Sequence, residues 1–434
     1  MERRKKPELL IPAGSLEVLR TAVMFGADAV YIGGEAFGLR AKAKNFSPEE
    51  MAEGIVFAHA KGVKVYVTAN ILAHNDDLEG AAAYFRELRD MEPETCDGLI
   101  ISDPGMFALA REVWPQAQIH ISTQANNTNY RTYQFWWGLG ARRVVSAREL
   151  ALEEIRAIRE RIPEEMEIES FVQGSMCISY SGRCLLSNYF TGRDANQGSC
   201  THPCRWKYAV VEETRPGEYL PVYENERGTY IFNSKDLCMI EHIPELVEAG
   251  IDSFKVEGRM KTALYIATVA RTYRRAIDDY FISEERYREN LGWYRAEISK
   301  CTYRQFTTGF YFGKPAGEAQ IYDNSTYVNE YIYLGSIEEV AMGSELSWLQ
   351  GEKDGDVFSL ARFEQKNKFC VGDIIEIMKP DGRNVPVAVE AMYNGEGEAV
   401  ENCPHARETM WVKLSETPAP YDLLRVENRS RTGA

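Results

Sequence analysis

Apolar runs rich in β-branched and aromatic residues alternate with helical patterns along roughly the first 260 residues. The run ELLIP at 8–12 precedes a helical pattern at 16–26, and the run DAVYIGG at 28–34 precedes a helical pattern at 48–62. Continuous apolar runs with intervening helices are typical of a parallel sheet with crossover helices. The further runs that we interpret as strands are VKVYVTANI, GLIISD, IHIST, RRVVSA, EIESFVQG, TYIFNS and DSFKVEG. Eight or nine such units predict an α/β fold of the (β/α)8 barrel type.

The pattern changes after about Thr302, where short apolar runs alternate with turns rich in Gly, Asp and Asn. Such a series predicts a small antiparallel β-barrel of roughly 100 residues. We therefore predict a (β/α)8 domain at 1–300, which carries a cysteine-rich insertion at 169–240, followed by a connecting segment at 301–330. A C-terminal all-β barrel domain is expected at 331–434.

The charge and the start of the chain narrow the class of protein. A net charge of −15 argues against a surface coated with basic residues for indiscriminate nucleic-acid binding, although it permits a local basic groove. The N-terminal sequence MERRKKPELLIPAG has only a short apolar run, and no segment approaches the roughly 20 apolar residues of a membrane span. We therefore expect a cytoplasmic protein, in which cysteines favour metal or redox chemistry over disulfides.

Four of the nine cysteines are crowded into the 28 residues from Cys177 to Cys204. Six residues separate Cys177 from Cys184, three separate Cys200 from Cys204, and Cys238 follows 34 positions later. Any four of these five thiols could enclose a metal centre. The first spacing is too long for the short knuckles of structural zinc sites and favours an iron-sulfur cluster held from several loops.

Cys238 has two interpretations. Asp236 is a candidate N-cap for a helix, which would place Cys238 near backbone amides that favour a thiolate. Alternatively, Cys238 is a buried helical thiol without chemistry. The remaining widely spaced thiols of the C-terminal half are expected to be isolated and buried, and these are Cys301, Cys370 and Cys403.

Polar residues gather just after the predicted strands, which in a barrel places them on one rim. The C-terminal rim is where barrel enzymes assemble their sites, although turns and caps also favour such residues. The candidates are Arg40, Asn70, Gln124, Asn126, Lys255, Glu257 and Arg259.

Hydrolase signatures are missing from the sequence. The six histidines are scattered, and neither HExxH nor GxSxG occurs. His202 lies between Cys200 and Cys204, so a cysteine-histidine dyad is the remaining peptidase arrangement.

The cysteine-rich run resembles the signature of peptidase family U32, the collagenase-like proteases of unassigned catalytic type. Further agreement lies in PAGSLE, VYIGG, STQANN, NSKDL, KVEGRMK, GDIIEI and YDLLR, along nearly the whole chain. The matching signature positions are Glu169, Phe171, Gly174, Ser175, Met176, Cys177, Gly182, Cys184, Leu186 and Ser187.

Within this family the chain is similar to a branch that forms 5-hydroxyuridine at the wobble position of tRNA. The resemblance implies an oxygen-independent hydroxylase with a 4Fe-4S cluster, prephenate as co-substrate, and the anticodon loop of tRNA as partner. It also implies the ligand set Cys177, Cys184, Cys200 and Cys238, with Cys204 as the alternative fourth ligand. The alternatives are a U32 peptidase, a hydroxylase of 23S rRNA cytidine, and a zinc-stabilised RNA-binding protein without catalysis.

The resemblance also suggests roles for the rim residues. The two carboxylates of prephenate suit planar guanidinium groups, and the cations expected at the mouth are Arg40, Arg183, Arg259 and Lys255, whose alternative role is ion pairing. Asn70, Gln124 and Asn126 are expected to bind the substrate ring or a uracil edge.

Proton transfer and RNA contact complete the expected site. Many members carry His immediately before Gly174, where this chain has Gln173, so proton transfer would pass to His120 or Glu257. The catalytic candidates are therefore Lys255, Glu257, Arg259 and His120. For RNA contact the basic candidates are Arg142, Arg143, Arg205 and Lys207. Trp206, Tyr189 and Phe190 are expected as stacking or core residues.

Overall fold

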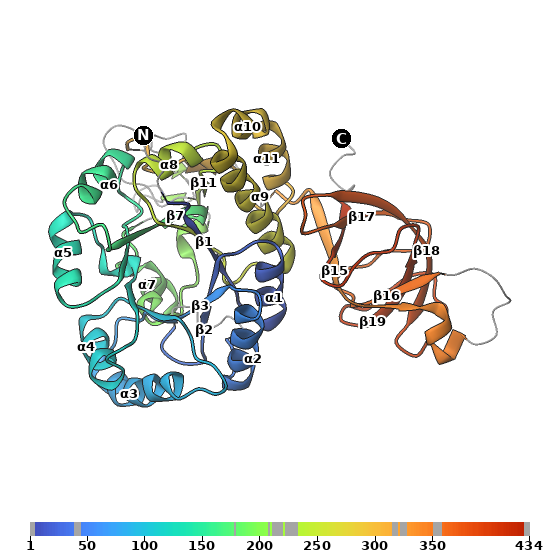
Figure 1. Cartoon of the computed structure of the whole chain (residues 1–434), viewed down its shortest axis with the longest axis horizontal. Helices are drawn as coiled ribbons and strands as arrows, with labels where there is room; N and C mark the ends of the chain where they lie inside the picture. The colour runs from blue at the N-terminus through green and yellow to red at the C-terminus, as the bar shows by residue number, and fades with distance from the viewer. Residues whose placement is uncertain are drawn as a thin grey trace.

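Two domains lie side by side in the computed structural model, an α/β barrel and a smaller β-barrel (Figure 1). The structure describes residues 5–38, 45–177, 179–206, 209–210, 220–221, 233–314, 320–321, 328–349 and 358–428.

The larger domain is a closed barrel of eight parallel strands, because β7 and β12 pair and close the sheet. The apolar runs of the sequence form buried strands because their apolar side chains point outward from the barrel and pack against the helices. The prediction of a (β/α)8 barrel is confirmed. The strands are β1 (Glu8–Pro12), β2 (Ala29–Gly33), β3 (Lys64–Ala69), β4 (Gly98–Ile101), β5 (Ile119–Ile121), β6 (Arg143–Val145), β7 (Glu167–Ser175) and β12 (Ser253–Val256).

Helices surround this barrel, and local caps set where they begin. Ser15 caps the first helix by accepting the N–H of Val18, and Ser47 and Glu50 form a capping box at the start of the second. The helices are α1 (Leu16–Met24), α2 (Pro48–His59), α3 (Asn75–Arg89), α4 (Pro104–Val113), α5 (Tyr130–Gly138), α6 (Leu152–Arg159), α8 (Ile243–Glu248), α9 (Ala263–Ile282), α10 (Glu284–Glu289) and α11 (Leu291–Ile298).

Charged side chains fill much of the barrel interior. The Arg143 guanidinium donates to Glu8 Oε1 at 2.6 Å and to Glu169 Oε2 at 3.0 Å. Lys255 Nζ donates to Glu169 Oε1 at 2.6 Å, and both side chains are buried. Because a buried charge is costly without a partner, this network fixes the lysine at the level where the strands end.

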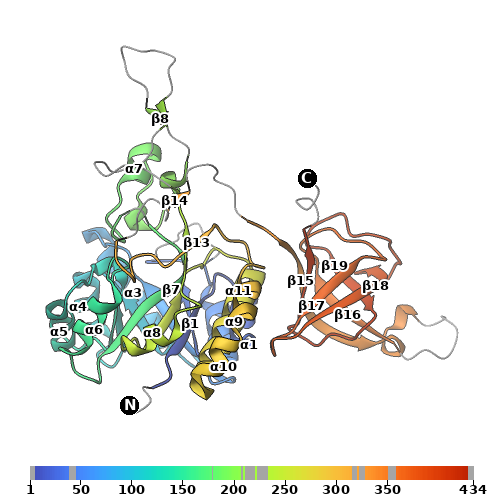
Figure 2. The same ribbon diagram turned by 90° about the horizontal axis from the view of Figure 1, so that it is seen from above.

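The segment after β7 rises above the carboxyl ends of the barrel strands, as α7 shows in Figure 2. It contains α7 (Leu186–Thr191), two single-turn 3-10 helices η2 (Ala195–Gln197) and η3 (Pro203–Arg205), and the strand pair β8 (Ala209–Val210) and β9 (Leu220–Pro221). A further 3-10 turn, η1 (Thr123–Ala125), follows β5. The run TYIFNS was expected as a barrel strand, but its described part is β10 (Asn233–Ser234), which pairs with β14 (Gln320–Ile321) in a separate sheet.

The prediction that Asp236 caps a helix is wrong, because residues Asp236–Cys238 form strand β11 and the helix α8 begins at Ile243. β11 runs antiparallel to β7 and pairs with β13 (Phe306–Thr307). Asp236 does not cap a helix but accepts from the buried Arg304 guanidinium at 2.8 Å. Burial raises the pKa of Cys238 to about 12, the opposite of the thiolate-favouring setting expected at a helix N-terminus.

The segment predicted as a connection at 301–330 contributes to the first domain. β13 extends its sheet, Cys301 is buried in its core, and the Tyr311 hydroxyl donates to the carbonyl of Phe171 at 2.6 Å. The described part of this segment therefore belongs with the α/β barrel rather than between the domains.

The second domain is a closed antiparallel barrel in the order β15-β16-β19-β18-β17-β20. Inward-facing apolar residues alternate with outward polar ones, as predicted for an all-β domain. Its elements are β15 (Tyr331–Met342), η5 (Gly343–Glu345), η6 (Ser347–Leu349), β16 (Ser359–Glu364), β17 (Ile374–Met378), β18 (Asn384–Asn394), β19 (Thr409–Leu414) and β20 (Leu423–Glu427).

A buried ionic contact joins the two domains. Arg425 of β20 donates to Glu297 Oε1 of α11 at 3.0 Å, and Arg271 of α9 donates to the carbonyl of Lys379 at 2.7 Å. Burial opposes ionisation of Glu297, but the charges of Arg271 and Arg425 outweigh it and lower the pKa of this carboxyl to about 2. The β-barrel is therefore held against the helices of the first domain by paired charges.

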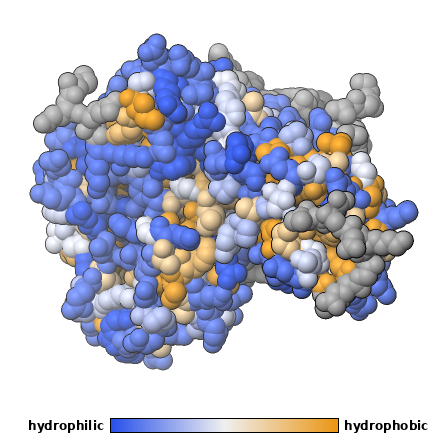
Figure 3. Space-filling view, turned by 45° about the vertical axis from the view of Figure 1, so that its right-hand side comes forward, coloured by the Kyte–Doolittle hydropathy of each residue, from blue (hydrophilic) through white to orange (hydrophobic). Residues whose placement is uncertain are grey.

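Hydrophilic residues cover much of the face seen in Figure 3, and apolar residues gather in several separate places on it, including one near its middle and others toward its right-hand side. Within the described part of the chain, no helix is both long enough and apolar enough to cross a membrane.

Candidate active site at the barrel rim

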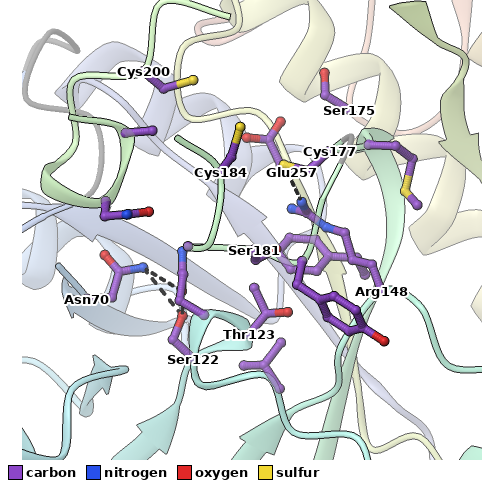
Figure 4. Close-up of a pocket in the computed structure, with 18 of the residues that line it drawn as sticks. Asn70, Ser122, Thr123, Arg148, Ser175, Cys177, Ser181, Cys184, Cys200 and Glu257 are labelled. Atoms are coloured by element: carbon purple, nitrogen blue, oxygen red, sulfur yellow. Dashed lines mark hydrogen bonds between the residues drawn. The ribbon is translucent and has the colours of Figure 1, made fainter. Parts of the chain in front are cut away.

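A pocket lies where the barrel strands end, between the rim and the cysteine-rich segment (Figure 4). On the barrel side its lining comes from β2, β3, β4, β6, β7 and β12 and from the residues that follow β5, and on the other side from residues 175–204. Five residues that were expected at the rim line this pocket together with four of the cysteines, and they are Asn70, Gln124, Lys255, Glu257 and Arg259.

Amide and hydroxyl groups form one wall of the pocket. The Asn70 side-chain amide donates to Ser122 Oγ and to Gln124 Oε1, each at 3.4 Å, and Ser122 Oγ donates to Gln124 Oε1 as well. Asn70 follows β3 and Ser122 follows β5, so the wall is built from the ends of separate strands. These three side chains offer donors and acceptors in a fixed array.

Two buried cations lie along the pocket. Arg259 Nη1 donates to Thr68 Oγ1 at 2.6 Å, and a Cβ on Gly33 would lie 2.1 Å from that same nitrogen. Glycine at this position therefore makes room for the guanidinium. Lys255 packs over the Tyr31 ring at 4.5 Å, and burial lowers the pKa of Lys255 although its partner Glu169 opposes the shift.

Four thiols line the opposite wall, and they belong to Cys177, Cys184, Cys200 and Cys204. Cys200 Sγ accepts the backbone N–H of His202 at 3.4 Å. Cys238 is not among the lining residues and lies on β11, paired in register with Gln173. In the described ranges, no three His, Cys, Asp or Glu side chains converge closely enough to hold one metal ion.

Glu257 reaches the pocket beside the thiols because β7 and β12 approach each other closely at their ends. Its backbone N–H donates to the carbonyl of Gln173 at 2.9 Å. Gly174 has a φ of +112°, and a Cβ there would lie 2.6 Å from the carbonyl oxygen of Glu257. A side chain at position 174 is thus excluded by both backbone conformation and contact.

Arg148 is a pocket residue that the sequence interpretation missed. Its Nη1 donates to Cys177 Sγ at 3.3 Å, and its guanidinium lies 4.1 Å from the centroid of the Phe171 ring. It stands three residues after β6, in the same post-strand position that selected the other rim residues. This position just after a strand was the sequence signal from which Arg148 could have been predicted.

Two predicted site residues, His120 and Asn126, are not among the residues that line the pocket. His120 is buried one layer deeper in the barrel, against Tyr66 at a ring distance of 4.5 Å. Burial and the charges of Arg143 and Lys255 hold the pKa of His120 well below its ordinary value. Asn126, in a left-handed conformation with φ of 55°, donates to the carbonyl of Gln124 at 2.7 Å and so stabilises the turn.

The cationic residues predicted at the mouth differ in where the structure places them. Arg183 is exposed on the cysteine-rich segment and is not among the residues that line the pocket. Arg40 and the side chain of Arg205 lie outside the described residues. Lys255, Glu257 and Arg259 do come together in one pocket, with Asn70 and Gln124.

Of the thiols expected to be isolated, Cys301 and Cys403 are buried and Cys370 is partly exposed.

Comparison with known proteins covers both domains. The family described as peptidase family U32 matches residues 14–321, and its C-terminal domain matches residues 350–425. A tRNA hydroxylation protein P1 of Bacillus subtilis is 39% identical over 421 residues, covering 97% of this chain and 95% of the relative. The tRNA hydroxylation protein P of Escherichia coli is 39% identical, covering 96% of this chain and 95% of the relative. A 23S rRNA 5-hydroxycytidine synthase of Escherichia coli is 34% identical, covering 77% of this chain and 49% of the relative.

Proposed function

The chain belongs to peptidase family U32, and from this premise we propose that it hydroxylates RNA, converting the wobble uridine of tRNA to 5-hydroxyuridine. The observation that carries the proposal is the similarity to two tRNA hydroxylation proteins over at least 95% of each chain. The relative named for rRNA is matched over only 49% of its length, which makes tRNA the better-supported substrate.

The donor set of the pocket suits the proposed 4Fe-4S cluster, because thiolates are the usual ligands of such clusters. Cys177, Cys184 and Cys200 would supply three ligands from one pocket wall. The fourth is either Cys204, which shares that wall, or Cys238, which the family resemblance implies. When bound, the cluster would supply electron-transfer chemistry to the hydroxylation.

The amide and hydroxyl wall would hold the base. A uracil edge presents an N–H donor between two carbonyl acceptors, and Asn70, Ser122 and Gln124 supply complementary groups. A wobble base is unpaired, so it can be turned out of the anticodon loop into a pocket at moderate cost.

Glu257 is our candidate for the residue that accepts a proton from the substrate. Its carboxylate lines the pocket, and its backbone is anchored to Gln173. Lys255 is held by Glu169 and would stabilise negative charge that develops nearby. His120, buried below, would remain neutral and outside the reacting group.

Prephenate is proposed as co-substrate, bound through its carboxylates. Among the residues that the structure describes, Arg148 and Arg259 are the guanidinium groups that line the pocket, and they follow β6 and β12 in the chain. Charge-assisted bonds from two such groups would fix a dicarboxylate in one orientation.

The proposal is tested in a bacterial strain that lacks its own tRNA hydroxylation proteins. We expect this chain to restore 5-hydroxyuridine in digested tRNA, measured by mass spectrometry, and expect Cys177→Ala to abolish it. Cys301→Ala is the matched control, because this buried thiol lies outside the pocket. Hydroxycytidine in rRNA instead, or unchanged nucleosides together with proteolysis that survives Cys177→Ala, would favour the other candidates.

A further inference from the structure

Three aromatic side chains of the cysteine-rich segment are exposed to solvent. Tyr189 is 82% exposed, Phe190 41% and Trp206 46%. The ring centroids of Tyr189 and Phe190 lie 5.1 Å apart, and those of Phe190 and Trp206 lie 6.0 Å apart. We call these three residues the aromatic platform. Such a contiguous exposed group is unusual on a folded surface and marks an interaction site.

Hydrogen bonds between hydroxyl and backbone groups connect the parts of this segment. Ser187 is fully buried, and its hydroxyl accepts the backbone N–H of Thr201 at 3.0 Å. Thr191 Oγ1 lies 3.2 Å from Thr201 Oγ1. These contacts attach α7 to the loop that contains Cys200. The segment thus buries its hydroxyls and exposes its aromatics, the reverse of the pattern that burial of apolar surface produces.

The aromatic platform belongs to the segment that lines the pocket. The segment that carries it also supplies Cys184, Cys200 and Cys204 to the lining. Tyr180 of the same segment lines the pocket and is 46% exposed, so it lies at the mouth. A polymer whose target group entered the pocket would therefore lie against the segment that carries the aromatic rings.

The local charge favours a polyanion. Residues 176–206 contain three arginines and one aspartate, a balance of 3 − 1 = +2, in a chain whose net charge is −15. Two of these arginines, Arg183 and Arg193, are exposed. Basic groups beside stackable rings are the combination that binds single-stranded nucleic acid.

We infer that the aromatic platform stacks the unpaired nucleotides next to the base that enters the pocket. The inference rests on the proposed function, since it places RNA at this mouth. It assigns recognition of the unpaired strand to Tyr189, Phe190 and Trp206, whereas the pocket residues recognise the reacting base.

The test measures binding of the full-length protein to an anticodon stem-loop RNA with a wobble uridine, by fluorescence anisotropy. Tyr189→Ala and Trp206→Ala should each weaken binding roughly 5- to 100-fold, the loss expected for one stacked base. Tyr189→Phe keeps the ring and should bind like the parent. Phe135→Ala is a matched control, because Phe135 is 59% exposed on the outer helix α5.

A 2-aminopurine placed beside the wobble position provides a second measurement. Its fluorescence should be quenched on binding, and Trp206→Ala should remove much of that quenching. Equal binding by the parent and both alanine variants would overturn the inference that the aromatic platform stacks nucleotides, while leaving the proposed function intact. A parent protein that does not bind the stem-loop would overturn both. Unchanged RNA binding with altered self-association in the variants would show a protein contact instead.

Discussion

Gly174→Ala isolates the contact between β7 and β12 that positions Glu257. The added Cβ would lie 2.6 Å from the carbonyl oxygen and 2.9 Å from the Cβ of Glu257, distances that folded proteins do not tolerate. The backbone at Gly174 also has a φ of +112°, which costs a side chain about 1 to 3 kcal/mol. Overpacking adds about 1 to 3 kcal/mol and must displace the end of β12.

Gly313→Ala separates the two contributions. Gly313 has a φ of +120°, and a Cβ there would meet nothing within 4 Å. Both variants therefore incur the cost of a side chain at positive φ. The difference between their free energies of unfolding reports the contact with Glu257 alone. We expect Gly174→Ala to be less stable than Gly313→Ala by about 1 to 3 kcal/mol.

The assays are thermal unfolding and 5-hydroxyuridine formation. Because displacement of a reacting group by about 1 Å can cost roughly 100-fold in rate, Gly174→Ala should lose about 10- to 100-fold in activity beyond the loss in Gly313→Ala. Equal losses of stability and activity in the two variants would refute the claim that this close approach positions Glu257.

Three further predictions follow from other contacts. Of Cys204→Ala and Cys238→Ala, one should lose the iron bound after anaerobic reconstitution and the other should keep it; loss in neither would exclude both as the fourth ligand. Arg148→Ala should raise the KM for prephenate about 10- to 100-fold, with partial rescue in Arg148→Lys, since a charge-assisted bond contributes about 1.5 to 3 kcal/mol; an unchanged KM would remove Arg148 from the binding role. The pKa of Glu297 is lowered to about 2 in the folded chain, so its contribution, on the order of 3 kcal/mol, is present above about pH 4.5 and lost as the pH falls toward 2. In Glu297→Gln, the free energy of unfolding should change less with pH over this range than in the parent protein. A curve parallel to that of the parent would contradict the stabilising role of Glu297.

The barrel could be predicted from the sequence because its strands are buried on both faces and separated by capped helices. ELLIP and DSFKVEG, far apart in the chain, pair as β1 and β12 because each apolar run needs two covered faces. The pocket could be anticipated from the same rule, which brings Asn70, Gln124 and Glu257 to one rim.

The errors come from contacts that local patterns do not contain. Asp236 has the sequence signature of a helix cap, but its partner is Arg304, 68 residues away, and this buried pair belongs to a strand. His120 has the right residue type but the wrong depth, because it lies two positions before Ser122 on an inward-facing row. Arg148 was missed because the direction of its side chain depends on Phe171 and Cys177.

The most direct test of the central claim uses protein purified and reconstituted without oxygen, incubated with unmodified tRNA and prephenate. The account predicts a broad visible absorption band, about four iron atoms per chain, and 5-hydroxyuridine that depends on both prephenate and Cys177. A colourless protein that carries zinc, or an iron-containing protein that leaves the wobble uridine unchanged under these conditions, would contradict it.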